Sequence, residues 1–317
     1  MASGPPDAAT EQAIALLGGE PGRVDAPRGI ELARGAASAG DPRACALMSV
    51  IAGAGIDRAP DWNEALDWLA RAARLGRRES QEELSLLAGA SGDDWDALRA
   101  KVDLATWLTL PAKVSLRDDP RLRTFEAFAS PATCDWLIRR AHGRLSRAHV
   151  YDFGSGAAAV HQARTNSETD FNLVECDLVI LLLRAKISAA TGLPTSVMEL
   201  TKVLHYQPGQ RFEPHYDFID PEVPALAAEL AARGQRLATF LLYLNEGYEG
   251  GETEFPQLGL RYKGRRGSAL MFANVGRDNA PDRRTLHAGL PPTSGEKWLL
   301  SQWIRDRPPA RTGGEAK

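Results

Sequence analysis

Two short segments carry side chains that could bind one metal ion. His215 and Asp217 are separated by one residue in EPHYDF, so a β-strand would point both side chains to the same face. His287 follows 72 residues later, before the last expected strand, where an antiparallel fold would return it beside the pair. Two imidazoles and a carboxylate leave three metal positions open for oxygen chemistry, as in non-haem iron sites. An isolated His-x-Asp pair is more often two ordinary polar surface residues.

A lysine close to these motifs could bind an anion. Lys297 opens the segment KWLLSQWI ten residues after His287, and on a strand it would share one face with Leu299, Ser301 and Trp303. A lysine pointing into a barrel lined by apolar groups is an uncompensated buried charge, which is costly unless an anion meets it. A carboxylate cosubstrate would supply that anion. The alternative is a solvent-exposed lysine at the start of the strand.

The elements that must position these side chains are expected to be strands. Four segments, LTKVLHYQ, ATFLLYL, SALMFAN and KWLLSQWI, are short, rich in aliphatic and aromatic residues, and separated by Pro/Gly turns. This spacing predicts a β-sandwich or jelly roll. Helices are predicted before these strands over residues 131–145 and 174–191, with a Gly-rich polar stretch at residues 154–169 between them.

The N-terminal third is rich in Ala, Leu and Gly and contains an internal repeat. GIELARGAASAG aligns with ALDWLARAARLG at an offset of 36 residues, and a second helix follows each copy, with Gly53 aligned on Gly89. We therefore predict two helix-pair repeats, near residues 29–53 and 65–89, because a period of this length indicates a solenoid. The pattern resembles Sel1-like repeats, which are related to tetratricopeptide repeats. The alternative is an Ala-rich helical bundle with accidental self-similarity.

Composition argues against several classes of partner. The chain has 38 basic and 41 acidic residues and a formal net charge of −3, so no strong positive field is present to bind nucleic acid or an anionic membrane. No run of ~18 apolar residues occurs, and the first residues lack the basic-then-apolar order of a secretory signal. We therefore expect a cytoplasmic protein. The three cysteines lie far apart without CxxC spacing, which supports neither a disulfide framework nor a zinc ribbon.

Longer segments around the candidate ligands resemble one enzyme family. KVLHYQPGQRFEPHYDF, RLATFLLYLNEGYEGGETEFP, GSALMFAN and TLHAGLPPTSGEKWLLSQWIRD follow one another as in the prolyl 4-hydroxylase family of Fe(II)/2-oxoglutarate-dependent dioxygenases. The resemblance covers about residues 125–307. It implies an α+β fold, in which a double-stranded β-helix (jelly-roll) catalytic domain with flanking helices follows an all-α helical-repeat region.

The repeats and the resemblance together predict four segments. Residues 1–110 are expected to form the Sel1-like repeat region and residues 111–123 a connector. Residues 124–308 are expected to form the dioxygenase domain, followed by a flexible tail at residues 309–317. The boundary is predicted here because the Ala-rich composition changes near the turn-like segment DDPR.

The resemblance assigns roles to the positions that match the family motifs. It implies that His215, Asp217 and His287 are the catalytic iron ligands. It implies that Lys297 forms a salt bridge with the distal carboxylate of 2-oxoglutarate. The rest of the implied cosubstrate site consists of two hydrogen-bonding residues and one aromatic wall: Tyr206, Thr253 and Trp303.

Three further correspondences concern the substrate. Glu199, Phe212 and Arg236 fall on positions that in related enzymes contact the peptide containing the target proline. Phe212 stands where the family often has tyrosine, so a hydroxyl contact to the substrate is expected to be missing. The alternatives are a surface glutamate at a strand start, a core phenylalanine and an exposed arginine.

The implied reaction is 4-hydroxylation of a peptidyl proline, in which 2-oxoglutarate and O2 give hydroxyproline, succinate and CO2. Fe(II) is the implied metal and ascorbate the implied reductant. The expected partner is a protein or peptide containing proline, docked by the N-terminal repeats. Two alternatives stay open: a hydroxylase of a free amino acid, a small molecule or another protein side chain, and a catalytically inactive repeat-based binding protein.

Other polar residues near the motifs have less specific expectations. His205 precedes Tyr206 on the same strand, so its ring should point to the opposite face as a structural histidine. Residues 221–235 are expected to form a short amphipathic helix that acts as a lid or restricts substrates. Arg283 and Arg284 either favour an acidic substrate or are solvated. No function is assigned to the remaining histidines, His142, His149 and His161.

Overall fold

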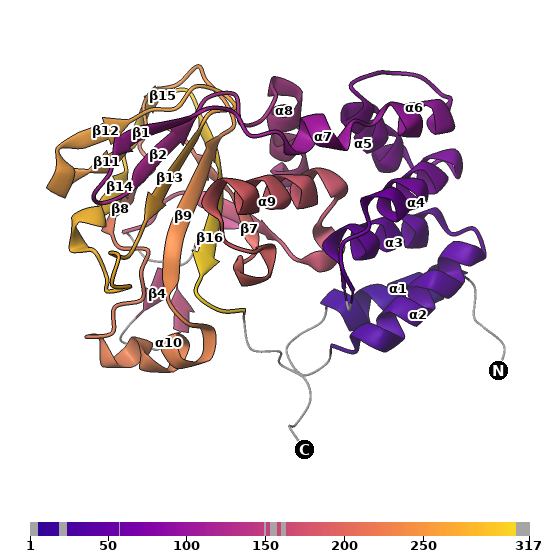
Figure 1. Cartoon of the computed structure of the whole chain (residues 1–317), viewed down its shortest axis with the longest axis horizontal. Coiled ribbons are helices and arrows are strands. Elements are labelled where there is room, and N and C mark those ends of the chain that lie inside the picture. Colours follow the sequence, from indigo (N-terminus) through magenta and orange to yellow (C-terminus); the bar gives the residue numbers. More distant parts are fainter. Residues whose placement is uncertain are drawn as a thin grey trace. The chain divides into compact units, whose positions relative to one another are not determined.

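The computed structural model describes residues 6–18, 24–56, 58–148, 150–152, 157–159 and 163–308, and Figure 1 shows the chain. Its contacts divide the chain into two compact units. The first contains the described residues up to Thr109 together with Phe171–Lys186. The second contains the described residues of Leu110–Asp170 and those from Ile187 onward.

The first unit is helical, as its composition predicts. Asp25, Asp41 and Asp61 cap three of the helices by accepting hydrogen bonds from backbone N–H groups of the first turn. In the described part of this unit the α-helices up to Thr109 are α1 (Pro6–Gly18), α2 (Ala26–Ser38), α3 (Pro42–Ala54), α4 (Trp62–Arg74), α5 (Arg78–Ala88), α6 (Trp95–Lys101) and α7 (Leu104–Leu108). Helices α2 and α4 begin 36 residues apart, as do α3 and α5, so the two helix pairs recur at the offset found in the sequence.

The glycine that ends α3 differs from the one in the sequence alignment. Gly53 is buried inside α3, where an added β-carbon would lie 2.9 Å from the Leu178 side chain. The left-handed turn after α3 is made by Gly55 (φ 66°), which corresponds to Gly89 (φ 59°) after α5. Alignment of Gly53 on Gly89 was therefore wrong, because α3 has 13 residues and α5 has 11.

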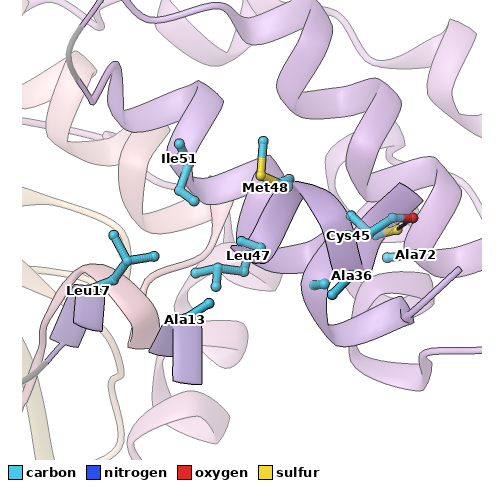
Figure 2. Close-up of a cluster of buried hydrophobic side chains, with 11 residues drawn as sticks. Ala13, Leu17, Ala36, Cys45, Leu47, Met48, Ile51 and Ala72 are labelled. Atoms are coloured by element: carbon cyan, nitrogen blue, oxygen red, sulfur yellow. Dashed lines mark hydrogen bonds between the residues drawn. The ribbon is translucent and has the colours of Figure 1, made fainter. Parts of the chain in front are cut away.

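The core of the first unit combines small and large side chains, as Figure 2 shows. Ala36 and Ala72 are buried, and their small side chains let neighbouring helices approach closely. Leu47, Met48 and Ile51 of α3 fill the remaining space. Burial of this apolar surface is the main force that holds the helix pairs together.

The second unit is built on two antiparallel sheets, a larger and a smaller one. The long strands of the larger sheet lie side by side in Figure 1. In the part of the chain that the structure describes, the larger sheet has eight strands. Their order is β1 (Lys113–Arg117), β2 (Leu122–Phe125), β13 (Ala269–Ala273), β9 (Arg236–Tyr243), β16 (Lys297–Arg305), β7 (Thr201–Tyr206), β6 (Ser167–Phe171) and β3 (Ser146–Arg147).

Two segments without predicted strands belong to this larger sheet. Residues 111–123, predicted as a connector, contain β1 and the start of β2. Strand β2 pairs with β13, and its Leu122 is fully buried opposite Phe272. All five residues of β1 are exposed, so β1 lacks the alternating pattern that identifies a strand in sequence. The Gly-rich stretch at residues 154–169 contains the start of β6, which belongs to this sheet, and β5 (Ala157–Ala159), which pairs outside it.

A smaller sheet completes the catalytic fold. Among the described residues its strands are β12 (Leu260–Tyr262), β11 (Thr253–Phe255), β14 (His287–Gly289) and β8 (Phe212–His215), in that order. Phe255 of this sheet packs with Leu204, Leu241 and Phe272 of the larger sheet in one core. This confirms the predicted double-stranded β-helix. Two short pairs lie beside it: β10 (Glu249–Gly250) with β15 (Pro292–Ser294), and β4 (Val150–Asp152) with β5 (Ala157–Ala159).

The flanking helices differ slightly from the predicted spans. α8 (Pro131–Ala141) ends before residue 145, because Gly143 turns the chain at φ 82°. α9 (Leu178–Thr191) begins after residue 174, behind a 3₁₀ turn at Leu173–Glu175. α10 (Ala227–Arg233) forms inside the insertion at residues 221–235, where a helix was predicted. None of the helices within the described residues is both long and apolar enough to cross a bilayer.

Candidate active site

The three predicted metal ligands come together on the smaller sheet. His215 ends β8, His287 begins β14, and the two residues are paired directly across these antiparallel strands, with ring centroids 4.3 Å apart. Asp217 follows β8 by two residues. Its carboxylate oxygens lie 3.6 Å from Nε2 of His215 and 3.4 Å from Nε2 of His287. The three candidate ligand atoms all lie within 4.8 Å of one another.

Backbone carbonyls orient both imidazole rings. Nδ1 of His215 lies 2.8 Å from the Glu213 carbonyl oxygen, and Nδ1 of His287 lies 3.0 Å from that of Thr285. A carbonyl oxygen only accepts hydrogen bonds, so each Nδ1 carries the proton and each Nε2 is left as a ligand atom. Burial, followed by the charge of His287, lowers the pKa of His215 to about 3. His215 is therefore neutral at physiological pH, as a metal ligand must be.

The carboxylate of Asp217 is held in its ionised form. Burial raises its pKa, but the electrostatic interaction with His287, followed by that with His215, outweighs burial and holds the pKa well below the usual range. The Thr239 hydroxyl donates a hydrogen bond of 2.6 Å to Oδ2 of Asp217. An ionised carboxylate beside two imidazoles provides the donor set of a non-haem Fe(II) site with open positions, so these residues fit that metal.

Lys297 is a buried cation that lacks a counter-ion. It opens β16, is completely buried, and its Nζ has no hydrogen-bond partner within the described part of the chain. The alternative of an exposed lysine at the strand start was therefore wrong. Burial lowers the pKa of Lys297 to about 7. A cation in this state binds an anion that replaces the hydration it has lost.

The pKa of Lys297 predicts how the stability of the ligand-free protein varies with pH. Because burial lowers this pKa from 10.5 to about 7, the unfolded chain binds more protons than the folded chain between those values. The destabilisation due to Lys297 is therefore complete below about pH 7 and disappears as the pH rises toward about 10. We expect the stability difference between Lys297→Met and the wild type to shrink over this range in denaturant unfolding. A difference that stays constant would contradict the buried ammonium.

One pocket joins Lys297 to the three candidate ligands. Leu204, Leu241 and Leu299 give it apolar walls. Burial raises the pKa of the Tyr206 phenol to about 12, so it keeps its proton and can donate a hydrogen bond. The Thr253 hydroxyl is 2.8 Å from the hydroxyl of Tyr243. All the residues predicted for the metal and the cosubstrate line this pocket: His215, Asp217, His287, Tyr206, Thr253, Lys297 and Trp303.

The sequence is similar to those of known proteins. Residues 201–305 match the family model described as the 2OG-Fe(II) oxygenase superfamily. The Arabidopsis thaliana protein named probable prolyl 4-hydroxylase 7 is 32% identical over 230 residues, which cover 67% of this chain and 71% of that protein. The chain belongs to the prolyl 4-hydroxylase family. It is therefore an Fe(II)- and 2-oxoglutarate-dependent dioxygenase.

A further member and a solved structure are also similar to the chain. Prolyl 4-hydroxylase 2 of Arabidopsis thaliana is 33% identical over 216 residues, covering 61% of this chain and 70% of that protein. The crystal structure of a viral collagen prolyl hydroxylase from Paramecium Bursaria Chlorella virus-1, a 2OG complex, is 28% identical. It covers 58% of this chain and 94% of that chain, with a TM-score of 0.44.

Two of the residues predicted for substrate contact in this prolyl 4-hydroxylase bind each other instead of lying free. The Arg236 guanidinium donates to both carboxylate oxygens of Glu199, at 2.6 and 3.1 Å, and Arg305 donates to Oε1 at 2.6 Å. Burial raises the pKa of Glu199, but the charge and hydrogen bond of Arg236 outweigh burial and lower it to about 2. Arg236 also lies 3.7 Å from the ring centroid of Trp303. The alternatives of a surface glutamate and an exposed arginine were wrong, and the pair supports the wall of the pocket.

Phe212 lines the pocket and belongs to a stack that the sequence did not reveal. Its ring lies parallel to His215, with centroids 3.5 Å apart and an interplanar angle of 14°. The guanidinium of Arg164 lies 4.6 Å from the centroid of Phe212 and donates to Glu168 at 2.5 Å. Arg164 lines the pocket but was missed, because it lies in the Gly-rich stretch and far in sequence from the recognised motifs.

The remaining polar residues have structural partners. His205 Nε2 lies 3.0 Å from the Glu296 carboxylate, and its ring stacks on Trp298, which supports the structural role predicted for it. Arg283 forms an ion pair with Glu222 at 2.6 Å, and Arg284 pairs with Asp119 and Asp282 at 2.8 and 2.7 Å. These ion pairs do not support the idea that the two arginines select an acidic substrate. His149 and His161 lie outside the described residues, as does the predicted tail at residues 309–317.

Proposed function

We propose that this chain hydroxylates proline residues of a protein or peptide at C4. One molecule each of 2-oxoglutarate and O2 is consumed; one oxygen atom enters succinate and the other the hydroxyproline, with release of CO2. The observation that carries the proposal is the pocket in which the two-histidine, one-carboxylate set lies with Lys297, whose ammonium has no hydrogen-bond partner among the described residues. A 2-oxoacid with a second carboxylate requires a metal that binds its 2-oxoacid group and a cation that binds its distal carboxylate. The triad would hold the metal, and Lys297 would be the cation.

The chain's own residues would bind and orient the reactants. His215, Asp217 and His287 would hold Fe(II), which when bound supplies activation of O2 for attack on a C–H bond. Lys297 would pair with the distal carboxylate of 2-oxoglutarate, which the Tyr206 and Thr253 hydroxyls would also contact. The apolar walls would exclude water from the bound cosubstrate and thereby strengthen these polar contacts.

Binding of the cosubstrate should change the protonation of Lys297. Since burial lowers its pKa to about 7, part of the population is neutral in the ligand-free protein at slightly alkaline pH. An anion beside the amine favours the charged form. The protein should therefore take up a proton as it binds 2-oxoglutarate above about pH 7, and this uptake would complete the ion pair.

We also propose which surface binds the substrate, which reductant is used and what the N-terminal helix pairs do. Trp303 forms a pocket wall whose ring is supported by Arg236 and Glu199, so this pair acts on the peptide through the aromatic surface. Ascorbate would restore Fe(II) after turnovers without substrate. The two helix pairs would serve as Sel1-like repeats that dock the protein substrate, a proposal supported by their recurrence at 36 residues.

Succinate formation can test the substrate class. The purified chain is supplied with Fe(II), 2-oxoglutarate, ascorbate and O2, together with a proline-rich peptide, the same peptide with alanine for proline, or free proline. We expect the proline peptide alone to stimulate succinate formation and to gain the mass of one oxygen atom on proline. Stimulation by free proline alone would instead support a small-molecule hydroxylase. No turnover in protein with bound iron would support the inactive binding protein.

A further inference from the structure

A chain of two buried side chains reaches Asp217 from the larger sheet. Thr239 lies on β9 and Asn274 directly follows β13, which pairs with β9 so that Phe272 is opposite Thr239. The Thr239 hydroxyl donates to Oδ2 of Asp217 at 2.6 Å, and Nδ2 of Asn274 donates to the Thr239 hydroxyl oxygen at 3.0 Å. The exposed fractions of Thr239, Asn274 and Asp217 are 1%, 0% and 3%, so water does not replace these bonds.

The protons of the hydrogen bonds from Asn274 to Thr239 and from Thr239 to Asp217 have only one consistent arrangement. The Thr239 hydroxyl has a single proton, and Asn274 supplies a proton to its oxygen, so the hydroxyl proton is free to point to Asp217. The opposite amide orientation of Asn274 would draw the hydroxyl proton away and leave the buried carboxylate without this donor. The backbone of Asn274 is fixed as well, since its N–H donates to the Leu237 carbonyl at 2.8 Å and its carbonyl accepts from Asp282 at 3.0 Å.

The amide oxygen of Asn274 has no hydrogen-bond partner among the described residues, although it is fully buried. An unsatisfied buried acceptor lowers stability, because the group has lost water without gaining another partner. The buried amide of Asn274 is therefore kept at a cost to stability, as is expected where a side chain serves the site.

We infer that Thr239 and Asn274 are positioning residues that hold the Asp217 carboxylate in one rotation for the metal. A carboxylate that rotates freely must be fixed in place when it binds a metal, and the loss of that freedom weakens binding. The Thr239 hydroxyl on Oδ2 fixes the Asp217 carboxylate before the metal binds. The Asn274–Thr239–Asp217 chain of hydrogen bonds therefore favours metal binding, and the inference rests on the proposed function only in that Asp217 binds the metal.

Substitution of Thr239 tests this inference by metal binding, without substrate. Thr239→Val keeps the side-chain shape but removes the hydroxyl, and loss of such outer-shell partners weakens metal binding about 10–100-fold. We expect that loss in anaerobic titrations with Fe(II) and Mn(II), and recovery in Thr239→Ser. The matched control is Thr201→Val on β7. This substitution also removes a buried threonine hydroxyl, which donates a hydrogen bond of 2.7 Å to Gln302 and does not contact the metal ligands. Thr201→Val should bind both metals as the wild type does.

Two further measurements separate the possible failures. Asn274→Leu removes the donor to Thr239 and should weaken metal binding in the same direction, which keeps the test usable if Thr239→Val does not fold. Both variants should also consume more 2-oxoglutarate per hydroxylated product than the wild type. Metal affinity equal to the wild type in folded Thr239→Val and Asn274→Leu would overturn the inference. Failure of the wild type to bind metal would instead overturn the proposed function.

Discussion

Replacing His287 with alanine should abolish 2-oxoglutarate turnover and weaken binding of Fe(II) by more than about a hundredfold. The reason is that His287 supplies one of three protein ligand atoms that lie within 4.8 Å, and its loss exceeds that of an outer-shell partner, which costs about 10–100-fold. Anaerobic titration with Fe(II) or Co(II) measures the binding, and succinate release measures the turnover.

The matched control for this substitution is His205→Ala. His205 is also buried on a strand, but its ring bonds to Glu296 and stacks on Trp298, away from the pocket. We expect His205→Ala to lose some stability and to keep its metal affinity. Equal metal binding by His287→Ala and the wild type would show that His287 is not a ligand.

Replacing Lys297 with methionine should separate cosubstrate binding from metal binding. A hydrogen bond to a charged group is worth about 1.5–3 kcal/mol, so kcat/KM for 2-oxoglutarate should fall about 10–150-fold while Fe(II) affinity stays unchanged. The ligand-free variant should also be more stable by about 1–3 kcal/mol at neutral pH, because it no longer buries an amine that lacks a hydrogen-bond partner in the described part of the chain. Steady-state kinetics and denaturant unfolding measure the two effects.

The opposite signs of these two effects distinguish a binding residue from a structural one. A lysine that only supports the fold would lower stability when replaced, and would change KM only through that loss. Lys297→Arg provides a control that keeps the charge but enlarges the head group. An unchanged KM in Lys297→Met would show that the distal carboxylate of the cosubstrate binds elsewhere.

The sequence predicted the site where its chemistry depends on local spacing. The two-residue period of a strand put His215 and Asp217 on one side, and the antiparallel return of the chain put His287 opposite His215. The same period put Lys297, Leu299, Ser301 and Trp303 on one face, and all four line the pocket. Local periodicity was sufficient here because each motif lies within a single strand or its immediate end.

The sequence did not predict features that depend on contacts between distant segments. In the sequence Thr239 is a single polar residue in an apolar strand. Only the pairing of β9 with β13 shows that Asn274 donates a hydrogen bond to it. The ion pair of Glu199 and Arg236 joins residues 37 positions apart, and neither has a spacing that indicates the other. Strand β1 was missed because it is exposed and pairs only with β2 at the edge of the larger sheet.

The domain boundary shows the same distinction. The change of composition near residue 110 marked the start of the second unit, since helices rich in Ala give way to strands there. Phe171–Lys186, however, belong to the first unit, although they lie inside the segment predicted as the dioxygenase domain. Gly53 packs against Leu178 and Leu181, and these long-range contacts have no signal in composition.

Oxidation of a peptidyl proline coupled to 2-oxoglutarate can be tested with isotopically labelled O2. The iron-loaded chain is incubated under heavy-oxygen gas with 2-oxoglutarate and a proline-containing peptide, and both products are weighed by mass spectrometry. We expect one labelled atom in succinate and one on the peptide proline, in equal amounts. Unlabelled succinate, or label in succinate with none on any proline of peptides that stimulate turnover, would contradict the proposed oxidation of proline.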